Sequence, residues 1–172
     1  MNIAYTMAPD RGDTDLLLKQ LAETLATHAI TCCGTVQINT DCPTGPCDMD
    51  VKVLPDGPIL RISQNLGSGS KGCRLDPSVL EEAVELVSRQ MAKGPELLIV
   101  NKFGKHEAEG RGFRTLIADA LMRDMPVLVG LNALNKPAFE AFVGAEVTRL
   151  EPTSDALFTW CLNTVSQMRS AA

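Results

Sequence analysis

The chain has 172 residues, of which 45% are hydrophobic and 22% charged, and its formal net charge is −5. These values are typical of one folded domain, and they exclude a wholly disordered chain and an extended basic surface for nucleic acid. Since no apolar run is long enough to cross a bilayer and the N-terminal residues lack a secretion signal, we expect a cytoplasmic protein that binds neither nucleic acid nor membrane.

The first half of the chain alternates strand and helix before a hairpin. The predicted elements are a strand at 2–6, a helix at 13–28, a strand at 30–38 and hairpin arms at 50–54 and 58–63. Leucines at helical spacing give the helix one apolar face, and Asp13 or Thr14 is placed to cap its start. The residues Pro55-Asp56-Gly57 are typical of the hairpin turn.

The second half continues this alternation. The predicted elements are a helix at 77–92, a strand at 96–101, a helix at 112–123, a strand at 126–131, a short helix at 137–143, a short strand at 146–150 and a helix at 154–168. Asp76 and Pro77 supply an N-cap and a first-turn proline. The strands at 96–101 and 126–131 are continuous apolar runs, as in parallel strands buried on both faces. We therefore predict a single three-layer α/β domain over residues 1–172, with a mainly parallel sheet and an inserted β-hairpin.

Cysteine spacing leaves two interpretations open. Cys42 and Cys47 flank a loop that holds two prolines and a glycine, which can bring the two sulfurs together. With Cys32 and Cys33 upstream, a four-thiolate zinc site is conceivable, although the paired spacing of a strong zinc motif is missing. The interpretation we favour is reduced, ordinary thiols, because no secretion signal accompanies them.

The loop that follows the hairpin has the composition of an anion site. In open parallel sheets, ligands bind outside the carboxyl ends of the strands, and this loop combines glycines, hydroxyls and cations directly before a helix start. Its candidate ligand-binding residues are Ser63, Gln64, Gly67, Ser68, Gly69, Ser70, Lys71, Gly72, Cys73 and Arg74. We expect the planar guanidinium of Arg74 to hold two oxygens of a phosphate-like ligand. Cys73 is the best nucleophile candidate, although a buried structural cysteine is the commoner case.

A second cationic loop follows the strand at 96–101. Its candidate ligand-binding residues are Asn101, Lys102, Lys105, Glu107, Glu109, Arg111 and Arg114. If both loops lie at one edge of the sheet, six cationic side chains can face one crevice and bind phosphate, a nucleotide or another oxyanion. The alternative is a solvated charged loop in which the glutamates pair with neighbouring cations.

The first loop, TMAPDRGDTD, lies where a phosphate-binding P-loop normally joins the first strand to the first helix. Only Gly12 of that motif is present, no lysine follows it, and Asp10, Asp13 and Asp15 would repel a triphosphate. Asn101 stands where a carboxylate would hold magnesium. Ordinary nucleotide hydrolysis is therefore not expected.

Two long segments, ISQNLGSGSKGCRLDP and LLIVNKFGKHEAEGRGFR, resemble a bacterial domain-of-unknown-function family that is met beside molybdenum-uptake genes and is related to P-loop nucleoside triphosphatases. The resemblance covers nearly the whole chain. It implies a P-loop-NTPase-like sheet with a degenerate P-loop, in which Asn101 to Gly104 replaces the D-E-x-G segment. It also makes molybdate a candidate oxyanion.

Together these features predict a binding protein for a phosphate-bearing ligand or small oxyanion, a nucleotide or molybdate, without conventional nucleotide hydrolysis. The alternative is a nucleoside triphosphatase or kinase-like enzyme, in which Lys71 replaces the P-loop lysine and Glu107 or Glu109 the magnesium ligand. A third hypothesis is an interaction subunit whose loops bind a partner protein. The amphipathic C-terminal helix packs either within the chain or against a second copy, so a homodimer stays open.

Overall fold

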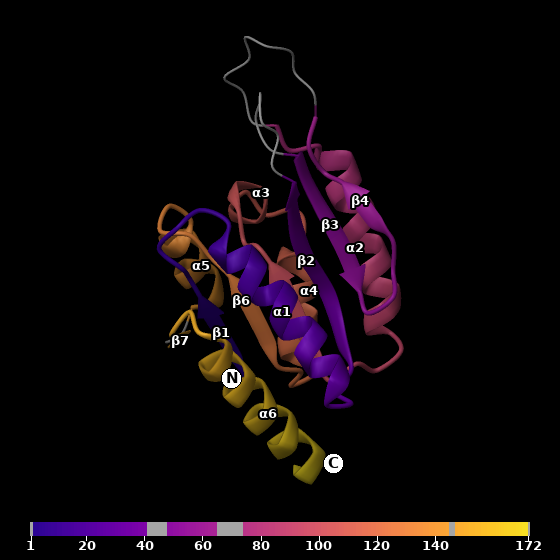
Figure 1. Ribbon diagram of the computed structural model, residues 1–172, viewed down its shortest axis with the longest axis vertical. Helices are drawn as coiled ribbons and strands as arrows, with labels where there is room; N and C mark the ends of the chain where they lie inside the picture. Colours follow the sequence, from indigo (N-terminus) through magenta and orange to yellow (C-terminus); the bar gives the residue numbers. More distant parts are fainter. Residues whose placement is uncertain (1, 41–47, 65–73, 145–146, 172) are drawn as a thin grey trace.

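A computed structural model of the chain describes residues 2–40, 48–64, 74–144 and 147–171. These residues form one sheet with helices on both faces (Figure 1). The strands are β1 (Ile3–Thr6), β2 (Cys32–Thr40), β3 (Asp48–Leu54), β4 (Ile59–Arg61), β5 (Leu97–Asn101), β6 (Val127–Gly130) and β7 (Thr148–Leu150). The helices are α1 (Asp13–Thr27), α2 (Pro77–Met91), α3 (Lys105–Ala108), α4 (Arg114–Met122), α5 (Lys136–Val143) and α6 (Ser154–Ala171).

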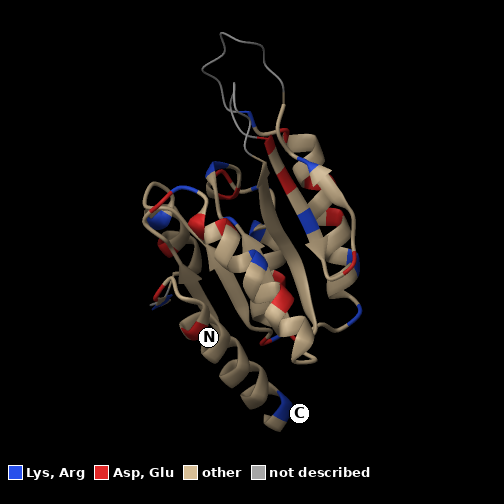
Figure 2. Cartoon of the chain, in the orientation of Figure 1, with Lys and Arg blue, Asp and Glu red and all other residues tan. Residues whose placement is uncertain are grey.

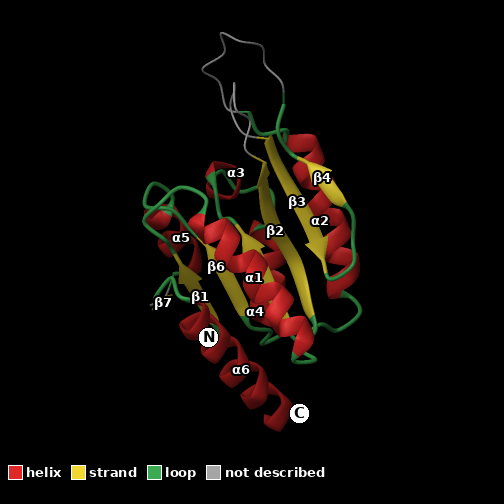
Figure 3. Cartoon of the chain, in the orientation of Figure 1, coloured by secondary structure: helices red, strands yellow, loops and turns green. Residues whose placement is uncertain are grey.

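The sheet has seven strands in the order β4-β3-β2-β5-β6-β1-β7 (Figure 3). The five strands from β2 to β7 in this order are parallel, and β3 and β4 add an antiparallel hairpin at one side. Because β4 runs in the same direction as β2, the segments that follow β1, β4, β5, β6 and β7 all leave from the same end of the sheet. We call this end the carboxyl edge. The predicted three-layer α/β fold with a mainly parallel sheet and an inserted hairpin is confirmed.

The core consists of two apolar layers, one on each face of the sheet. Helices α1 and α6 cover one face, and α2, α4 and α5 cover the other (Figure 1). Alternate residues of β5 point to opposite layers, since Leu98 packs in the α2 layer and Ile99 in the α1 layer. This two-sided burial explains the continuous apolar run of the strand. Helix α6 buries Leu157 and Val165 against the sheet, so its apolar face packs within the chain.

The predicted cap is wrong at the start of α1 and confirmed at the start of α2. The cap of α1 is Gly12, with φ +94° and no side-chain hydrogen bond, so the predicted cap at Asp13 or Thr14 is wrong. The Thr14 hydroxyl instead accepts a hydrogen bond from the Ala8 N–H at 2.9 Å. The predicted cap of α2 is confirmed, because Asp76 Oδ1 accepts from the backbone of the first turn, 3.0 Å from the N–H of Ser78.

The sequence predicts an open loop after residue 101 and a helix that begins at residue 112. In the structure, the short helix α3 lies within this segment. Four residues are too few to produce a detectable apolar periodicity. Helix α4 begins at Arg114, two residues later than predicted, after Gly112 with φ +59°.

The cysteines within the described ranges are buried. Cys32, Cys33 and Cys161 are free thiols, and burial raises the pKa of both Cys33 and Cys161 to about 12. Cys42 and Cys47, the candidate metal ligands, lie outside the described residues. Among the described residues, no group of three or more His, Cys, Asp or Glu is arranged to hold a metal ion. In the same part of the chain, no helix combines the length and apolarity needed to cross a membrane.

Candidate functional site

Described residues line three cavities at the carboxyl edge. The largest, of about 750 Å³, lies among the segments that follow β1, β6 and β7, and we call it the loop cavity. The second, of about 370 Å³, lies between the β3–β4 hairpin and the segment after β5, and we call it the hairpin cavity. A third, of about 510 Å³, lies between the start of α1 and β2. Arg11 and Lys102 line all three, so these two cations stand at the junction of the cavities.

A buried carboxylate, Asp15, lies beneath this junction on the first turn of α1. Its Oδ1 accepts a hydrogen bond from Asn101 Nδ2 at 2.8 Å. Its Oδ2 accepts from Asn39 Nδ2 at 2.7 Å and from Gln37 Nε2 at 3.3 Å. Lys102 Nζ lies 3.9 Å from Oδ1. The carboxylate therefore joins α1 to β2 and to the end of β5, and it is surrounded by donors.

This arrangement does not fit a magnesium ion held between the first loop and the end of β5. The groups around Asp15 are amide N–H donors and an ammonium, whereas magnesium needs oxygen ligands in their place. The Thr14 hydroxyl is engaged by the backbone of Ala8. Asn101 supplies a neutral amide, whose Oδ1 is buried and has no hydrogen-bond partner within the described residues.

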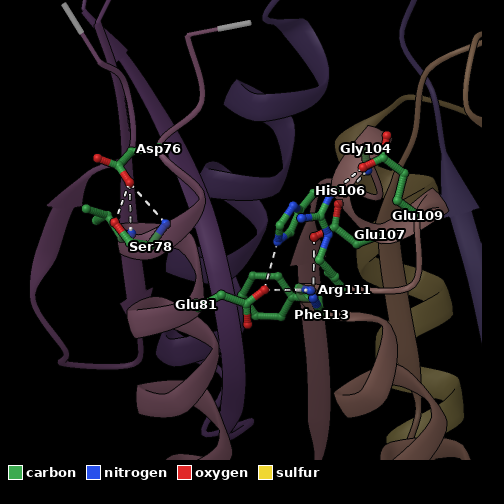
Figure 4. A network of polar contacts seen from close by, with 11 residues as sticks. Asp76, Ser78, Glu81, Gly104, His106, Glu107, Glu109, Arg111 and Phe113 are labelled. Atoms are coloured by element: carbon green, nitrogen blue, oxygen red, sulfur yellow. Dashed lines mark hydrogen bonds and ion pairs between the residues drawn. The ribbon is translucent and has the colours of Figure 1, made fainter.

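The segment after β5 is organised by a second buried carboxylate, Glu107 (Figure 4). Its Oε2 accepts from the N–H of Gly104 at 2.9 Å, and its Oε1 accepts from the N–H of Phe113 at 3.3 Å. Burial raises the pKa of Glu107, although these backbone donors act in the opposite direction. A Cβ on Gly112, where φ is +59°, would lie 2.3 Å from Glu107 Oε1, so any other residue there would have to displace the carboxylate.

A contact between His106 and Glu81 ties this segment to α2 (Figure 4). His106 Nε2 lies 2.7 Å from Glu81 Oε1, and the N–H of Gly112 donates to the same oxygen at 3.0 Å. Partial burial works to raise the pKa of Glu81, but the hydrogen bonds from His106 and Gly112 outweigh it and lower the pKa. The wall between α2 and α3 is thus held by side-chain and backbone contacts.

The cations predicted to share one crevice divide into two groups. Arg111 pairs with Glu109 on the surface, and Lys105 lies 3.7 Å from the same carboxylate. Arg114 donates to the Glu107 carbonyl at 3.4 Å, and its guanidinium stacks over the Phe142 ring. Arg111 and Arg114 therefore contact these partners and are not among the residues that line the hairpin cavity.

The other group lines the hairpin cavity: its described members are Arg74, Lys102 and Lys105. Arg11, which the sequence analysis did not single out, joins them. Within the described residues, Arg11 has no hydrogen-bond or ion-pair partner. Lys and Arg residues of α3 and of the loop before α1 lie at the carboxyl edge in Figure 2.

Contacts between the hairpin and the segment before α2 hold Arg74 at the cavity wall. Arg74 Nε donates to the Gln64 carbonyl at 3.1 Å, and Nη2 lies 3.6 Å from Asp48 Oδ1. Ser63 Oγ accepts from the N–H of Met49 at 3.1 Å. Ser63 and the Gln64 backbone thus have structural partners, while Arg74 combines such contacts with a place on the wall. The remaining predicted residues of this loop, Gly67, Ser68, Gly69, Ser70, Lys71, Gly72 and Cys73, lie outside the described residues.

Sequence reasoning treated Asp15 only as a charge that repels phosphate, and it missed the residue's buried position. A signal was present, because Asp15 precedes Leu18 by three residues and Leu25 by ten, and so shares the buried face of α1. The partners Gln37 and Asn39 carry no such signal, because their role depends on how β2 lies beside α1. His106 likewise finds Glu81 only through tertiary packing.

Known proteins resemble this chain in sequence and in fold. The chain is 31% identical over 169 residues to the molybdenum import ATP-binding protein ModC 2 of Bradyrhizobium diazoefficiens, in a match that covers 97% of this chain and 19% of that relative. Its structure is similar to the solution structure of a human cancer-related nucleoside triphosphatase, with a TM-score of 0.63, 14% sequence identity and 100% of both chains covered. The predicted resemblance to the nucleoside-triphosphatase fold is thereby confirmed. Residues 3–160 match the family described as "Protein of unknown function (DUF2478)", and the chain belongs to this family.

Proposed function

We propose that this chain binds a nucleotide at the carboxyl edge, with the phosphates at the junction formed by Arg11 and Lys102. The observation that carries the proposal is that these two cations line every one of the three cavities there. The crevice outside the carboxyl ends of parallel strands is where such sheets bind ligands. The loop cavity, at about 750 Å³, lies within the range of small-molecule sites.

Two comparisons support a nucleotide as the ligand class. The relative that is 31% identical is an ATP-binding protein by its name, and the similar solved structure is that of a nucleoside triphosphatase. A smaller oxyanion such as phosphate or molybdate would meet the same two cations, and it belongs in the same experiment.

We further propose that binding occurs without conventional, magnesium-dependent hydrolysis. Asp13 stands where a P-loop has its lysine, and the carboxylate expected at the end of β5 is the amide of Asn101. Lys102 follows at once, so positive charge comes from the end of β5 rather than from the first loop. This exchange supplies a cation for phosphate oxygens but no carboxylate for magnesium.

Isothermal titration with ATP, ADP, GTP, phosphate and molybdate, each with and without magnesium, tests the proposal. Loss of one charge-assisted contact in Lys102→Met or Arg11→Met should weaken nucleotide binding about tenfold or more. The matched control is Lys93→Met, since Lys93 is exposed at the opposite edge, between α2 and β5. Absence of binding heat from every anion at millimolar concentration, or equal losses in Lys102→Met and Lys93→Met, would overturn the proposal.

Phosphate release separates the binding protein from the enzyme. With ATP or GTP and magnesium, we expect release no faster than in buffer. Release that disappears in Lys71→Ala would instead favour the nucleoside triphosphatase, in which Lys71 acts as the P-loop lysine.

A further inference from the structure

The loop cavity and the hairpin cavity meet at Arg11 and Lys102 but differ in charge. In the described part of the chain, the loop cavity is lined by as many cations as carboxylates: Arg11, Lys102 and Arg149 against Asp10, Asp15 and Glu151. Among the residues that the structure describes, those that line the hairpin cavity include four cations, Arg11, Arg74, Lys102 and Lys105, and one carboxylate, Glu107. An excess of positive charge in one cavity of a chain with net charge −5 indicates an anionic ligand.

Two of these cations are partly neutralised from outside the cavity, since Arg74 Nη2 lies 3.6 Å from Asp48 Oδ1 and Lys102 Nζ lies 3.9 Å from Asp15 Oδ1. The carboxylate on the wall itself, Glu107, neutralises little of the charge of Arg11 and Lys105. Both oxygens of Glu107 accept backbone hydrogen bonds, from Gly104 and Phe113, so the group is occupied by its own segment. Lys105 contacts Glu109, but that lysine side chain is 80% exposed, and an ion pair of this kind is weak in water. Ligand oxygens can therefore compete for Lys105.

The floor of the hairpin cavity is apolar. It is formed by Met49, Val51, Ile62, Leu75, Leu80 and Phe113. Met49 and Leu75 are partly exposed here, and a ligand with an apolar ring would cover them, whereas a bare oxyanion would leave them facing water. The volume of about 370 Å³ lies at the small end of ligand sites. Charge and floor together fit a compact aromatic or heterocyclic body that carries a phosphate, carboxylate or sulfonate.

The walls of this cavity are fixed by contacts that require no ligand. Glu81 holds both His106 and the backbone of Gly112, and Arg74 is bonded to the Gln64 carbonyl. Such a cavity is preformed, which lowers the entropic cost of binding.

We propose that the hairpin cavity is a second ligand site, which holds a small amphipathic organic anion while the nucleotide occupies the loop cavity. The simultaneous occupancy rests on the proposed function, and the anion site itself does not. Arg11 and Lys102 then lie between the two ligands and contact the anionic groups of both.

Fluorescence titration with 8-anilinonaphthalene-1-sulfonate, a compact aromatic sulfonate, tests the anion site. We expect Lys105→Glu to weaken probe binding about fivefold or more, because it reverses a charge at the rim. The charge-matched control Lys93→Glu should change the dissociation constant by less than about twofold. A melting curve of each variant verifies that it is folded.

A second pair of variants tests the apolar floor. Leu75→Trp places a larger side chain in the cavity and should abolish most of the fluorescence increase. Ile59→Trp is its control, since Ile59 is exposed and lines the groove between α1 and the hairpin, away from this cavity. If the probe binds equally well to the Lys105 and Leu75 variants and to their controls, the hairpin cavity is not its site and the proposal fails.

Titration of the probe in saturating ATP tests simultaneous binding. We expect the probe to stay bound, with a dissociation constant changed by less than about threefold. Competitive displacement by ATP would show a single shared site and overturn the second site, while nucleotide binding would stand. If calorimetry shows no ATP binding but the probe still depends on Lys105, the proposed function fails and the anion site stands without it.

Discussion

The two buried carboxylates of the carboxyl edge, Asp15 and Glu107, are stabilised in different ways. Asp15 accepts from side-chain amides that lie 22, 24 and 86 residues away in the chain. Glu107 accepts from backbone N–H groups three and six residues away. Asp15 therefore joins separate elements of the fold, whereas Glu107 shapes its own segment. The first depends on the whole sheet being assembled, and the second needs only a local turn.

Removal of the Asp15 carboxylate should have the largest effect on stability. In Asp15→Ala, the buried amides of Asn101 and Gln37 lose this acceptor, whereas the exposed amide of Asn39 can bind water. Each unsatisfied buried donor costs about 1–3 kcal/mol. We expect the free energy of unfolding, measured by urea denaturation, to fall by about 3 kcal/mol. Asp13, an exposed aspartate two residues earlier on the same helix, provides the control, and Asp13→Ala should change stability by less than about 0.5 kcal/mol. Equal stability of the two variants would show that Asp15 does not join these elements.

The next largest effect should come from the glycine that contacts Glu107. Gly112→Ala places a Cβ 2.3 Å from Glu107 Oε1 at a φ of +59°. Gly110→Ala is a matched control, because Gly110 also has a positive φ, of +92°, but no atom within 4 Å of the added Cβ. Backbone strain alone costs about 1 kcal/mol, so Gly110→Ala should lose about that much and Gly112→Ala about 2 kcal/mol or more in urea denaturation. Equal losses would mean that Glu107 and its segment move to accommodate the added Cβ without lowering the free energy of unfolding.

A smaller and pH-dependent difference should distinguish Glu107 from its exposed neighbour Glu109. Burial raises the pKa of Glu107 above its unfolded value of 4.5, so its contribution to stability is fully present below that pH and is lost as the pH rises through the raised pKa. The stability of wild type relative to Glu107→Gln should therefore fall as the pH rises above about 4.5.

Glu109→Gln should show the opposite trend. Its hydrogen bond with Arg111 lowers the pKa of Glu109, so that contribution is present above pH 4.5 and is lost as the pH falls through the lowered pKa. Denaturant melts of the three proteins at each pH measure both trends. The same slope in both variants would contradict the burial of the Glu107 charge.

The smallest effect on stability is expected for Lys102→Met. The Lys102 side chain is 38% exposed and its Nζ lies 3.9 Å from Asp15, while the amides remain as partners of the carboxylate. We expect the free energy of unfolding to change by less than about 1 kcal/mol, in contrast to Asp15→Ala. A loss as large as that of Asp15→Ala would make Lys102 a structural partner of Asp15 rather than a cation available to a ligand.

Several parts of the fold were predictable because their cause is local. The Asp76-Pro77 pair starts α2, the Pro55-Asp56-Gly57 turn joins β3 to β4, and the apolar run of β5 indicates a strand buried on both faces. Capping, turn geometry and periodicity act over a few residues, and each appears directly in the order of the amino acids.

The sequence could predict at which edge of the sheet the candidate site lies, but not which side chains line it. The rule that parallel strands present their carboxyl ends at one edge brought the segments after β4 and β5 together, and Arg74, Lys102 and Lys105 do line one cavity. The directions taken by Arg111 and Arg114 were not predictable, because each depends on a nearby partner, Glu109 or Phe142, whose position is set by packing.

The sequence by itself determined the alternation of elements and the buried strands. It also determined that Asp13 stands where a P-loop has its lysine and that Lys102 directly follows β5. Only the tertiary structure decided that Asp15 is buried among amides of β2 and β5, and that Arg11 stands with Lys102 between two cavities. The physical reason is the distance along the chain over which each effect acts. Propensities and caps operate between neighbours in the chain, whereas the burial of a charge and the shape of a cavity depend on surfaces contributed by distant elements.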